Sequence, residues 1–269
     1  MKKRRFKILL AALALLLAAG VCGCAGSGSS RDDSLNKILE AGEFVIGLDV
    51  HYPPMGFTDE NGEIVGFDID LAQAVCDRLG VKLVKRGIDW DRKEDELNGG
   101  RIDCVWNGMS VTPARAEAMN LSEPYLKNEL VLVVPGSSEV RDISGLAGKT
   151  IGAQAGSSTE DVLRTTDLIP GMTVKTYPDV PALLDEMNRQ EVDAALVDSV
   201  FAYYYFLSSS DRYYMLSDSL SDEKLAIGFR KGDQKLRDKV QEIIRDLKAD
   251  GTLEKISMKW FGNDITIVK

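Results

Sequence analysis

Short apolar strands alternate with amphipathic helices along the first half of this 269-residue chain, and this alternation limits the possible folds more than any other feature. Apolar runs at 44–48, 81–85 and 102–106 predict strands, and helical spacing appears between them at 68–79 and 90–98. Strands that are joined through helices pair in parallel, because the crossover helix returns the chain to the same end of the sheet. The sequence therefore predicts an α/β fold with a mostly parallel sheet and helices on its faces.

A second α/β unit follows the first. Strands are predicted at 130–134, 149–153, 174–177 and 194–197, helices near 161 and at 181–189 and 199–207, and a tail at 225–229, 234–250 and 252–260. Each unit has about a hundred residues, which is within the usual range for a domain. Periodicity does not decide which unit the tail joins.

A secretory signal precedes both units. Five cations within residues 2–7 are followed by an apolar run at 8–19, which is too short to span a membrane comfortably. The signal ends at 21–24 with Val-Cys-Gly-Cys, which resembles the bacterial lipoprotein cleavage box. Cys24 fits the lipid-modified position better than Cys22, because a small glycine precedes it where a branched valine precedes Cys22. The alternative is a cleaved, secreted protein whose cysteines are incidental.

The mature chain is strongly acidic. Removal of the signal, residues 1–23, leaves 28 Lys and Arg against 42 Asp and Glu, a formal net charge of about −14. Such a charge argues against binding nucleic acid and against direct adhesion to anionic lipid. Residues 24–32 are rich in Gly and Ser at their start and predict a flexible tether.

Cysteine and histidine are sparse after the signal. Only Cys76, in a predicted helix, and Cys104, in a predicted buried strand, remain, and His51 is the only histidine in the chain. This spacing matches no metal-binding pattern, so we expect neither a metal ion nor a cofactor. Two buried free thiols are expected, although a disulfide between them is compatible with an extracellular location.

Residues 107–115 join the end of a strand to the start of a helix. Thr112 suits the N-cap and Pro113 the first helical position, where a missing N–H costs nothing. Unpaired N–H groups at such a junction suit an anion, and the planar fork of Arg115 can hold a carboxylate at two points. The segment predicts either a carboxylate clamp or an ordinary strand-to-helix turn with a surface arginine.

Other polar and aromatic residues lie where ligands bind in sheets of this kind. Asp49, Trp90 and Asn107 each follow the end of a predicted strand or lie in the loop after it, and ligands settle beyond the carboxyl ends of parallel strands. A second turn, rich in Gly and Ser, leads into a helix with Ser157 or Ser158 as its N-cap. Its exposed N–H groups again suit an anion.

A series of short motifs occurs along residues 35–263 in an order that is typical of a known family. The motifs are Tyr52-Pro53-Pro54, Gly66-Phe67-Asp68-Ile69-Asp70-Leu71, Ile102-Asp103, Ser110-Val111-Thr112 with Arg115, Gly152 to Ser158, Val192-Asp193-Ala194 and Asp250-Gly251-Thr252. Each motif is weak alone, but the ordered set resembles the polar amino-acid binding proteins of ABC importers, in extracellular solute-binding protein family 3. The resemblance implies a two-lobed periplasmic-binding-protein fold, with two sheets and a hinge of two segments. The first lobe would be 33–127 plus 223–269, and the second 128–222.

The resemblance also implies roles for individual residues. Arg115 would bind the α-carboxylate of the ligand, helped by the backbone N–H groups of Ser110 and Ser158, and Asp198 would bind the α-ammonium group. The remaining positions would form the slot: Tyr52 and Trp90 as walls, Asn107 and Gly108 as lining, and Asp49, Gln154 and Ser157 near the ligand side chain. Physical chemistry agrees, since a zwitterion taken out of water must have both charges matched.

Structural roles are the alternative for several of these residues. Tyr52 could pack on its two prolines, and Trp90 could be a core residue at the start of a helix. Helix caps or turn positions are the alternative for Asp49 and Asp198 and the expected role for Asp68 and Asp70.

The predicted function is that of an extracytoplasmic receptor, anchored to the cell membrane by a lipid on Cys24. As a monomer, it would deliver a free amino acid to an ABC permease. Asp49, Gln154 and two aromatic rings favour a polar neutral or cationic ligand, and a cation could also contact Trp90. Glutamine, cystine, histidine and arginine all remain open.

Two other functions compete with this one. A cleft enzyme such as a dehydratase needs a positioned acid or base, and the single histidine and the lack of a recognisable nucleophile and base argue against it. A sensor module for a signalling partner is the other alternative, and the lack of a recognisable output domain argues against a self-contained receptor.

Overall fold

The structure of the protein, a computed structural model, describes residues 32–209 and 212–269. The predicted signal peptide at 1–23, the predicted lipid attachment site Cys24 and the predicted tether up to residue 31 lie outside the described residues. Within the described ranges, every helix is too short or too polar to cross a membrane.

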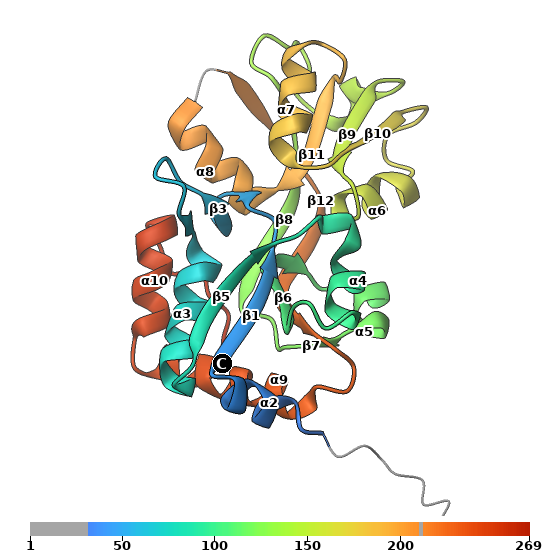
Figure 1. Cartoon of the computed structure of the whole chain (residues 1–269). Helices are drawn as coiled ribbons and strands as arrows, with labels where there is room; N and C mark the ends of the chain where they lie inside the picture. Colours follow the sequence, from blue (N-terminus) through green and yellow to red (C-terminus); the bar gives the residue numbers. More distant parts are fainter. Residues whose placement is uncertain (1–31, 210–211) are drawn as a thin grey trace, which may run out of the picture. The chain divides into compact units, whose positions relative to one another are not determined.

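One large sheet forms the centre of the described part of the chain (Figure 1). Its hydrogen-bonded order is β10-β9-β11-β8-β12-β6-β1-β5, and β7 pairs with β12 beside this path. The strands are β1 (Glu43–Leu48), β5 (Lys82–Gly87), β6 (Cys104–Ser110), β7 (Asn120–Leu121), β8 (Leu126–Pro135), β9 (Thr150–Gln154), β10 (Thr173–Tyr177), β11 (Ala194–Asp198) and β12 (Tyr213–Phe229). Parallel pairing joins β5, β1 and β6 into a first strand group and β10, β9 and β11 into a second. The predicted α/β fold is therefore confirmed.

Two long strands, β8 and β12, lie between these groups and pair antiparallel to each other. β12 also pairs with β6 of the first group, and β8 with β11 of the second. Strands rise about 3.3 Å per residue, so the 10 residues of β8 and the 17 of β12 are long enough to extend along both groups. The sequence analysis expected two sheets joined by two segments. Because the joining segments are themselves hydrogen-bonded strands, the two sheets form one.

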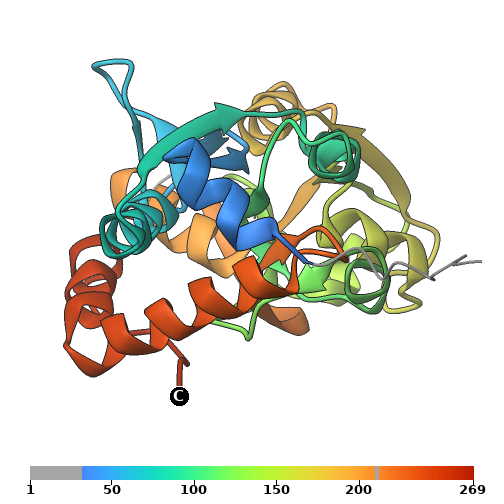
Figure 2. The same ribbon diagram turned by 60° about the horizontal axis from the view of Figure 1, so that its bottom comes forward.

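Helices cover the faces of the sheet (Figures 1 and 2). They are α2 (Ser34–Ala41), α3 (Phe67–Leu79), α4 (Lys93–Asn98), α5 (Pro113–Ala118), α6 (Ser158–Thr165), α7 (Val180–Asn188), α8 (Ser199–Ser209), α9 (Gln234–Ala249) and α10 (Thr252–Phe261), with 3-10 turns η1 (Trp90–Arg92) and η2 (Ile143–Leu146). α9 packs on α2 and α3, and α10 on α3 and α9; Figure 2 shows α9 beside α2. The C-terminal tail thus packs on elements of the first half of the chain.

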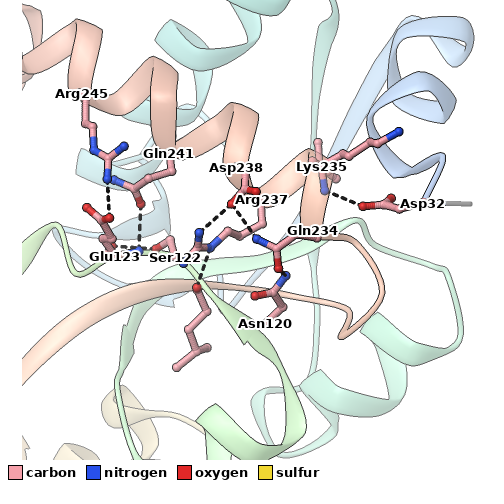
Figure 3. A network of polar contacts seen from close by, with 12 residues as sticks. Asp32, Asn120, Ser122, Glu123, Gln234, Lys235, Arg237, Asp238, Gln241 and Arg245 are labelled. Carbon is pink, nitrogen blue, oxygen red and sulfur yellow. Dashed lines mark hydrogen bonds and ion pairs between the residues drawn. The ribbon is translucent and has the colours of Figure 1, made fainter.

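A polar network reinforces the attachment of α9 (Figure 3). The Asn120 side chain donates to Gln234 Oε1 over 3.1 Å, and the Glu123 backbone N–H donates to the buried Gln241 Oε1 over 2.8 Å. Arg237 Nε donates to a backbone carbonyl of β7 over 2.9 Å. These bonds satisfy polar groups of the chain between β7 and β8, so α9 is held to the sheet by hydrogen bonds as well as by its apolar face.

A second, small antiparallel sheet consists of β2 (His51–Tyr52), β3 (Gly56–Thr58) and β4 (Ile64–Val65). This sheet matters for the site because it carries Tyr52.

Both cysteines of the described chain, Cys76 and Cys104, are buried and free, as the sequence analysis expected. Burial raises the pKa of Cys76 to about 12 and that of Cys104 well above its usual value. Neither thiol is therefore a reactive thiolate near neutral pH.

The close packing of α7 on the sheet over Gly152 provides a test of the fold. A Cβ atom on this β9 residue would lie 2.1 Å from Leu183 Cδ1 and 3.2 Å from Val192 Cγ1, and both side chains are buried. We expect Gly152→Ala to lower the free energy of unfolding by about 1–3 kcal/mol, the usual cost of overpacking, measured by urea denaturation. Gly232→Ala is the control, since nothing lies within 4 Å of a Cβ there. Equal stability of the two variants would contradict this packing.

Candidate functional site

One cavity brings together all eleven residues that the sequence analysis assigned to the site. It is lined by Asp49, Tyr52, Trp90, Asn107, Gly108, Ser110, Arg115, Gln154, Ser157, Ser158 and Asp198, and it encloses about 290 Å³ including its open mouth. This volume is near the lower end of the range for small-molecule sites. The lining comes from elements of both strand groups, so the cavity lies between them.

Strand β6 supplies the middle of the lining. It extends to Ser110, and all seven of its residues are buried, whereas the sequence analysis ended the strand at Trp106. Asn107, Gly108 and Ser110 therefore lie within a strand and not in the loop after it. Gly108 has φ +58°, and a Cβ atom there would come 3.3 Å from Tyr52 Cε1. A glycine at this position keeps a side chain away from the wall of the cavity.

Arg115 is a buried cation that is bonded to neutral groups. Thr112 caps α5 by accepting from the Arg115 N–H, and Pro113 is at the first helical position, as predicted. Arg115 is 6% exposed; its Nη1 donates to the Ser110 carbonyl over 2.9 Å and its Nη2 to the Gly156 carbonyl over 3.3 Å. Among the described residues, no carboxylate oxygen lies within 4.0 Å of it. Its burial lowers its pKa, and an anion in the cavity would restore the missing charge partner.

Asp198 ends β11 on the other side of the cavity. Its carboxylate accepts short hydrogen bonds from the Tyr52 hydroxyl and from the Asn128 side-chain amide. Burial, and then the nearby charge of Glu223, raise the pKa of Asp198 to about 7, although both hydrogen bonds and Arg115 oppose the shift. A cation beside this carboxylate would lower the pKa again.

Asp49 and Gln154 connect the two strand groups at another point of the cavity. Gln154 Nε2 donates to Asp49 Oδ2 over 2.7 Å, and the His51 backbone N–H donates to Asp49 Oδ1 over 2.8 Å. Burial raises the pKa of Asp49. Asp49 is thus a second carboxylate in the lining, partnered by the Gln154 amide and by the imidazole of His51, whose Nδ1 lies 3.5 Å from Asp49 Oδ1.

The turn before α6 contributes two serines. Ser157 is the N-cap and accepts from the Glu160 N–H over 3.2 Å, so the choice between the two serines is resolved. The Ser158 hydroxyl donates to Ser110 Oγ over 3.0 Å and thereby joins α6 to β6.

The two aromatic walls pack and line the cavity at the same time. The ring of Tyr52 stacks on Phe201 at 5.6 Å between centroids. Trp90 is 7% exposed and belongs to the buried cluster around Leu97, while Lys93 Nζ lies 5.5 Å from its ring centroid. Trp90 thus combines the expected core position at the start of a helical turn with a place in the lining. Tyr52 also combines packing with a place in the lining, but it packs on Phe201, whereas the expected partners were its two prolines.

The expected role of Asp68 and Asp70 as helix caps is wrong. Gly66 is the N-cap of α3, without a side-chain cap. Asp68 is fully buried and accepts from the Gly108 N–H over 2.6 Å and from the Tyr125 hydroxyl over 3.0 Å, and burial raises its pKa to about 7. Asp70 accepts from Lys259 and Trp260 of α10. Asp68 thus supports the cavity wall at Gly108 from behind, a role that local helix signals do not reveal.

Sequence reasoning missed two polar residues directly behind the lining, Asn128 and Glu223. They face each other across the pairing of β8 and β12. Asn128 shares the buried face of β8 with Leu126 and Leu130, between two charged neighbours. A polar residue on the buried face of a strand is a signal that period-2 analysis could have found, had the strand been predicted to begin at Leu126.

No group of three or more potential metal ligands occurs in the part of the chain that the structure describes. The lining combines a buried cation, Arg115, with two carboxylates, Asp49 and Asp198, and two aromatic rings, Tyr52 and Trp90, a chemistry that suits a small polar molecule.

Comparison with known proteins identifies the family. Residues 44–263 match the family described as bacterial extracellular solute-binding proteins, family 3. The chain is 30% identical over 258 residues to the L-cystine-binding protein TcyJ of Escherichia coli K12, covering 95% of this chain and 96% of that protein. It is 29% identical over 260 residues to the arginine-binding extracellular protein ArtP of Bacillus subtilis 168, with 96% and 98% covered.

A solved structure gives the same result. An ABC uptake transporter substrate-binding protein from Streptococcus pneumoniae, with bound histidine, superposes with a TM-score of 0.84 at 37% identity, covering 88% of this chain and 99% of that one. The predicted two-lobed periplasmic-binding-protein fold is confirmed, and the relatives are binding proteins and not enzymes. The chain belongs to family 3 of the bacterial extracellular solute-binding proteins.

Proposed function

We propose that this protein is an extracytoplasmic receptor that binds a free amino acid between two lobes and delivers it to an ABC permease. The observation that carries the proposal is the pair Arg115 and Asp198 in one cavity. Arg115 is a buried cation without a carboxylate partner among residues 32–209 and 212–269, and Asp198 is a carboxylate with a raised pKa. An amino acid brings an α-carboxylate for Arg115, with the backbone N–H groups of Ser110 and Ser158, and an α-ammonium group for Asp198. Both buried charges then gain a partner.

The charge of the lining favours a polar neutral or cationic side chain. The lining contains one cation, Arg115, and two carboxylates, Asp49 and Asp198. A zwitterion uses one charge of each sign, which leaves Asp49 with Gln154 for the ligand side chain. The cystine, arginine and histidine in the printed names of the relatives are compatible with this chemistry.

The lobes of the proposed receptor are residues 33–127 with 223–269 and residues 128–222, joined through β8 and β12. Arg115 belongs to the first lobe and Asp198 to the second. A ligand that contacts both binds the closed arrangement better than an open one, and only such a difference in affinity shifts the equilibrium toward closure. The closed form of a monomer is then what the permease recognises.

Membrane attachment is proposed from the sequence alone. Residues 1–23 form the signal peptide, Cys24 carries the lipid, including palmitate, and residues 24–32 act as the tether. A tether keeps the receptor near the permease and raises its effective concentration there.

A thermal-shift screen against the common amino acids, cystine and ornithine tests the ligand assignment. At about a hundred times its dissociation constant, a ligand stabilises the fold by about 2.7 kcal/mol, which raises Tm by several degrees. We expect Arg115→Gln to abolish the shift, because it removes the charge partner of the carboxylate. The matched control is Arg189→Gln, whose side chain is exposed and pairs with Glu186. A screen without any stabilising amino acid, or an unchanged shift in Arg115→Gln, would contradict the proposal.

The affinity for arginine should depend on pH through Asp198. Its pKa is about 7 without ligand, and pairing with an ammonium group lowers it, so binding below this pH releases a proton. The dissociation constant should therefore rise by up to about tenfold per unit as pH falls below 7, and level off above about pH 8. Titration calorimetry in two buffers measures both the affinity and the proton release. Asp198→Asn should bind more weakly, with a flatter pH profile; an equally steep profile in this variant would assign the proton to another group.

The lipid anchor is tested by substitution in the full-length chain. We expect Cys24→Ser to move the protein from the membrane fraction to the soluble fraction and to abolish palmitate labelling. Cys22→Ser is the matched control and should leave both unchanged. Loss of labelling in Cys22→Ser alone would place the lipid on the other cysteine.

A further inference from the structure

Glu223 lies directly behind the cavity and has no role in the proposed function so far. It belongs to β12 and faces Asn128 of β8 in the register of the two strands. It is not part of the lining, but it contacts three residues that are connected with the cavity: Ser110, Ser158 and Asn128.

The hydroxyl groups of Ser110 and Ser158 both donate hydrogen bonds within the cluster that they form with Glu223. Ser110 Oγ donates a short hydrogen bond to Glu223 Oε2. Ser158 Oγ lies 3.0 Å from Ser110 Oγ and 3.2 Å from the same Glu223 oxygen, so its single hydrogen has two acceptors in this cluster. Because the hydrogen of Ser110 is used on Glu223, a hydrogen bond between the two serines requires Ser158 as the donor.

This arrangement determines what the serines offer a ligand. A hydroxyl whose hydrogen is engaged presents only its lone pairs to other partners. Ser110 and Ser158 are both in the lining, so their oxygens act as acceptors there. The two hydroxyl oxygens and Asp198 are thus acceptors in the lining, while Arg115 and the backbone N–H groups of the two serines are the proposed donors.

The negative charge of Glu223 also favours a cation over an anion near Asp198. Asn128 Nδ2 donates a short bond to Asp198 Oδ1 and lies 3.4 Å from Glu223 Oε2, so a single amide lies between two carboxylates. Asn128 is itself buried, with its Oδ1 accepting from Ser199 over 3.2 Å. The repulsion between the two carboxylates is relieved by a cation and made worse by an anion.

We propose that Glu223 is a positioning residue that orients the hydroxyls of Ser110 and Ser158 as acceptors, so that this end of the cavity selects the α-ammonium group of an amino acid. This inference rests on the proposed function, since it names how one group of that ligand is recognised. It predicts that Glu223 matters for the ammonium group and not for the rest of the ligand.

The test compares each amino acid with its desamino analogue, in which hydrogen replaces the ammonium group. The probes are arginine with guanidinovalerate, histidine with imidazolepropionate, glutamine with glutaramate, and cystine with dithiodipropionate. Titration calorimetry is done on the wild-type chain, on Glu223→Gln and on Asp222→Asn. Gln has the size of Glu, and Asp222→Asn removes the same charge from an exposed neighbour on β12.

We expect Glu223→Gln to weaken binding of the amino acid by about tenfold to a hundredfold, the range for a lost hydrogen bond to a charged group. Binding of the desamino analogue should be unchanged or tighter, because a negative charge near its carboxylate has gone. Asp222→Asn should change neither.

Other results overturn the inference. Equal weakening of both members of a pair would show that Glu223 only supports the fold, and tighter binding of the amino acid would show that Glu223 competes with the ligand. A wild-type chain that binds none of the amino acids of the thermal-shift screen refutes the proposed function, and the inference with it. If the wild-type chain binds an amino acid, but Glu223→Gln changes the affinity for the amino acid and for its desamino analogue by the same factor, only the inference is refuted.

Discussion

The antiparallel pairing of β8 with β12 is the contact on which both halves of the sheet depend. Each strand group is parallel within itself, and the groups are joined only through this pair in the hydrogen-bonded order of the described sheet. The same pair places Asn128 opposite Glu223 behind the cavity. The same two strands therefore connect the lobes and carry the polar residues behind the cavity. A change in the bend of these strands must move the two sides of the cavity relative to each other.

The cavity contains two charged side chains, Arg115 and Asp198, that no oppositely charged side chain of the described residues contacts. The buried guanidinium of Arg115 is bonded to two carbonyl oxygens, and Asp198 shares its surroundings with a second carboxylate. Supporting residues hold these groups in place: Asp68 fixes the Gly108 N–H, and Asn128 fixes Asp198. A site that is preorganised and electrostatically incomplete gains most from a ligand carrying both missing charges, because little reorganisation opposes binding.

Sequence patterns predicted most elements of the fold for definite physical reasons. Buried parallel strands are continuous apolar runs, and caps such as Thr112 and Gly42 mark helix ends. What the patterns missed depends on tertiary contacts. The start of β8 alternates exposed charged residues with buried ones, so it lacks the apolar run. Most of β12 before Leu225 is polar and exposed or half-exposed, and it lacks an apolar run over that length. Asp68 resembles a helix cap locally, and only the approach of β6 gives it a different partner.

The candidate site residues follow from the resemblance and from their places near strand ends, and the structure places them around one cavity. Glu223 and Asn128 were not found, because their role depends on the register between two strands that are distant in sequence. Spacing along a chain cannot reveal a cross-strand pair unless both strand boundaries are known.

Over one stretch of their pairing, β12 also uses more residues than β8. From Met215 to Ser221, six steps along β12 face the three steps from Val133 to Leu130 in β8. Surplus residues of this kind bulge out of the ladder, so their number does not decide which side chains face the cavity further along the strand. A deletion in β8, by contrast, would turn Asn128 or its neighbours to the opposite face. In this chain, an insertion or deletion is therefore expected to disturb the cavity less in the bulged stretch of β12 than in β8.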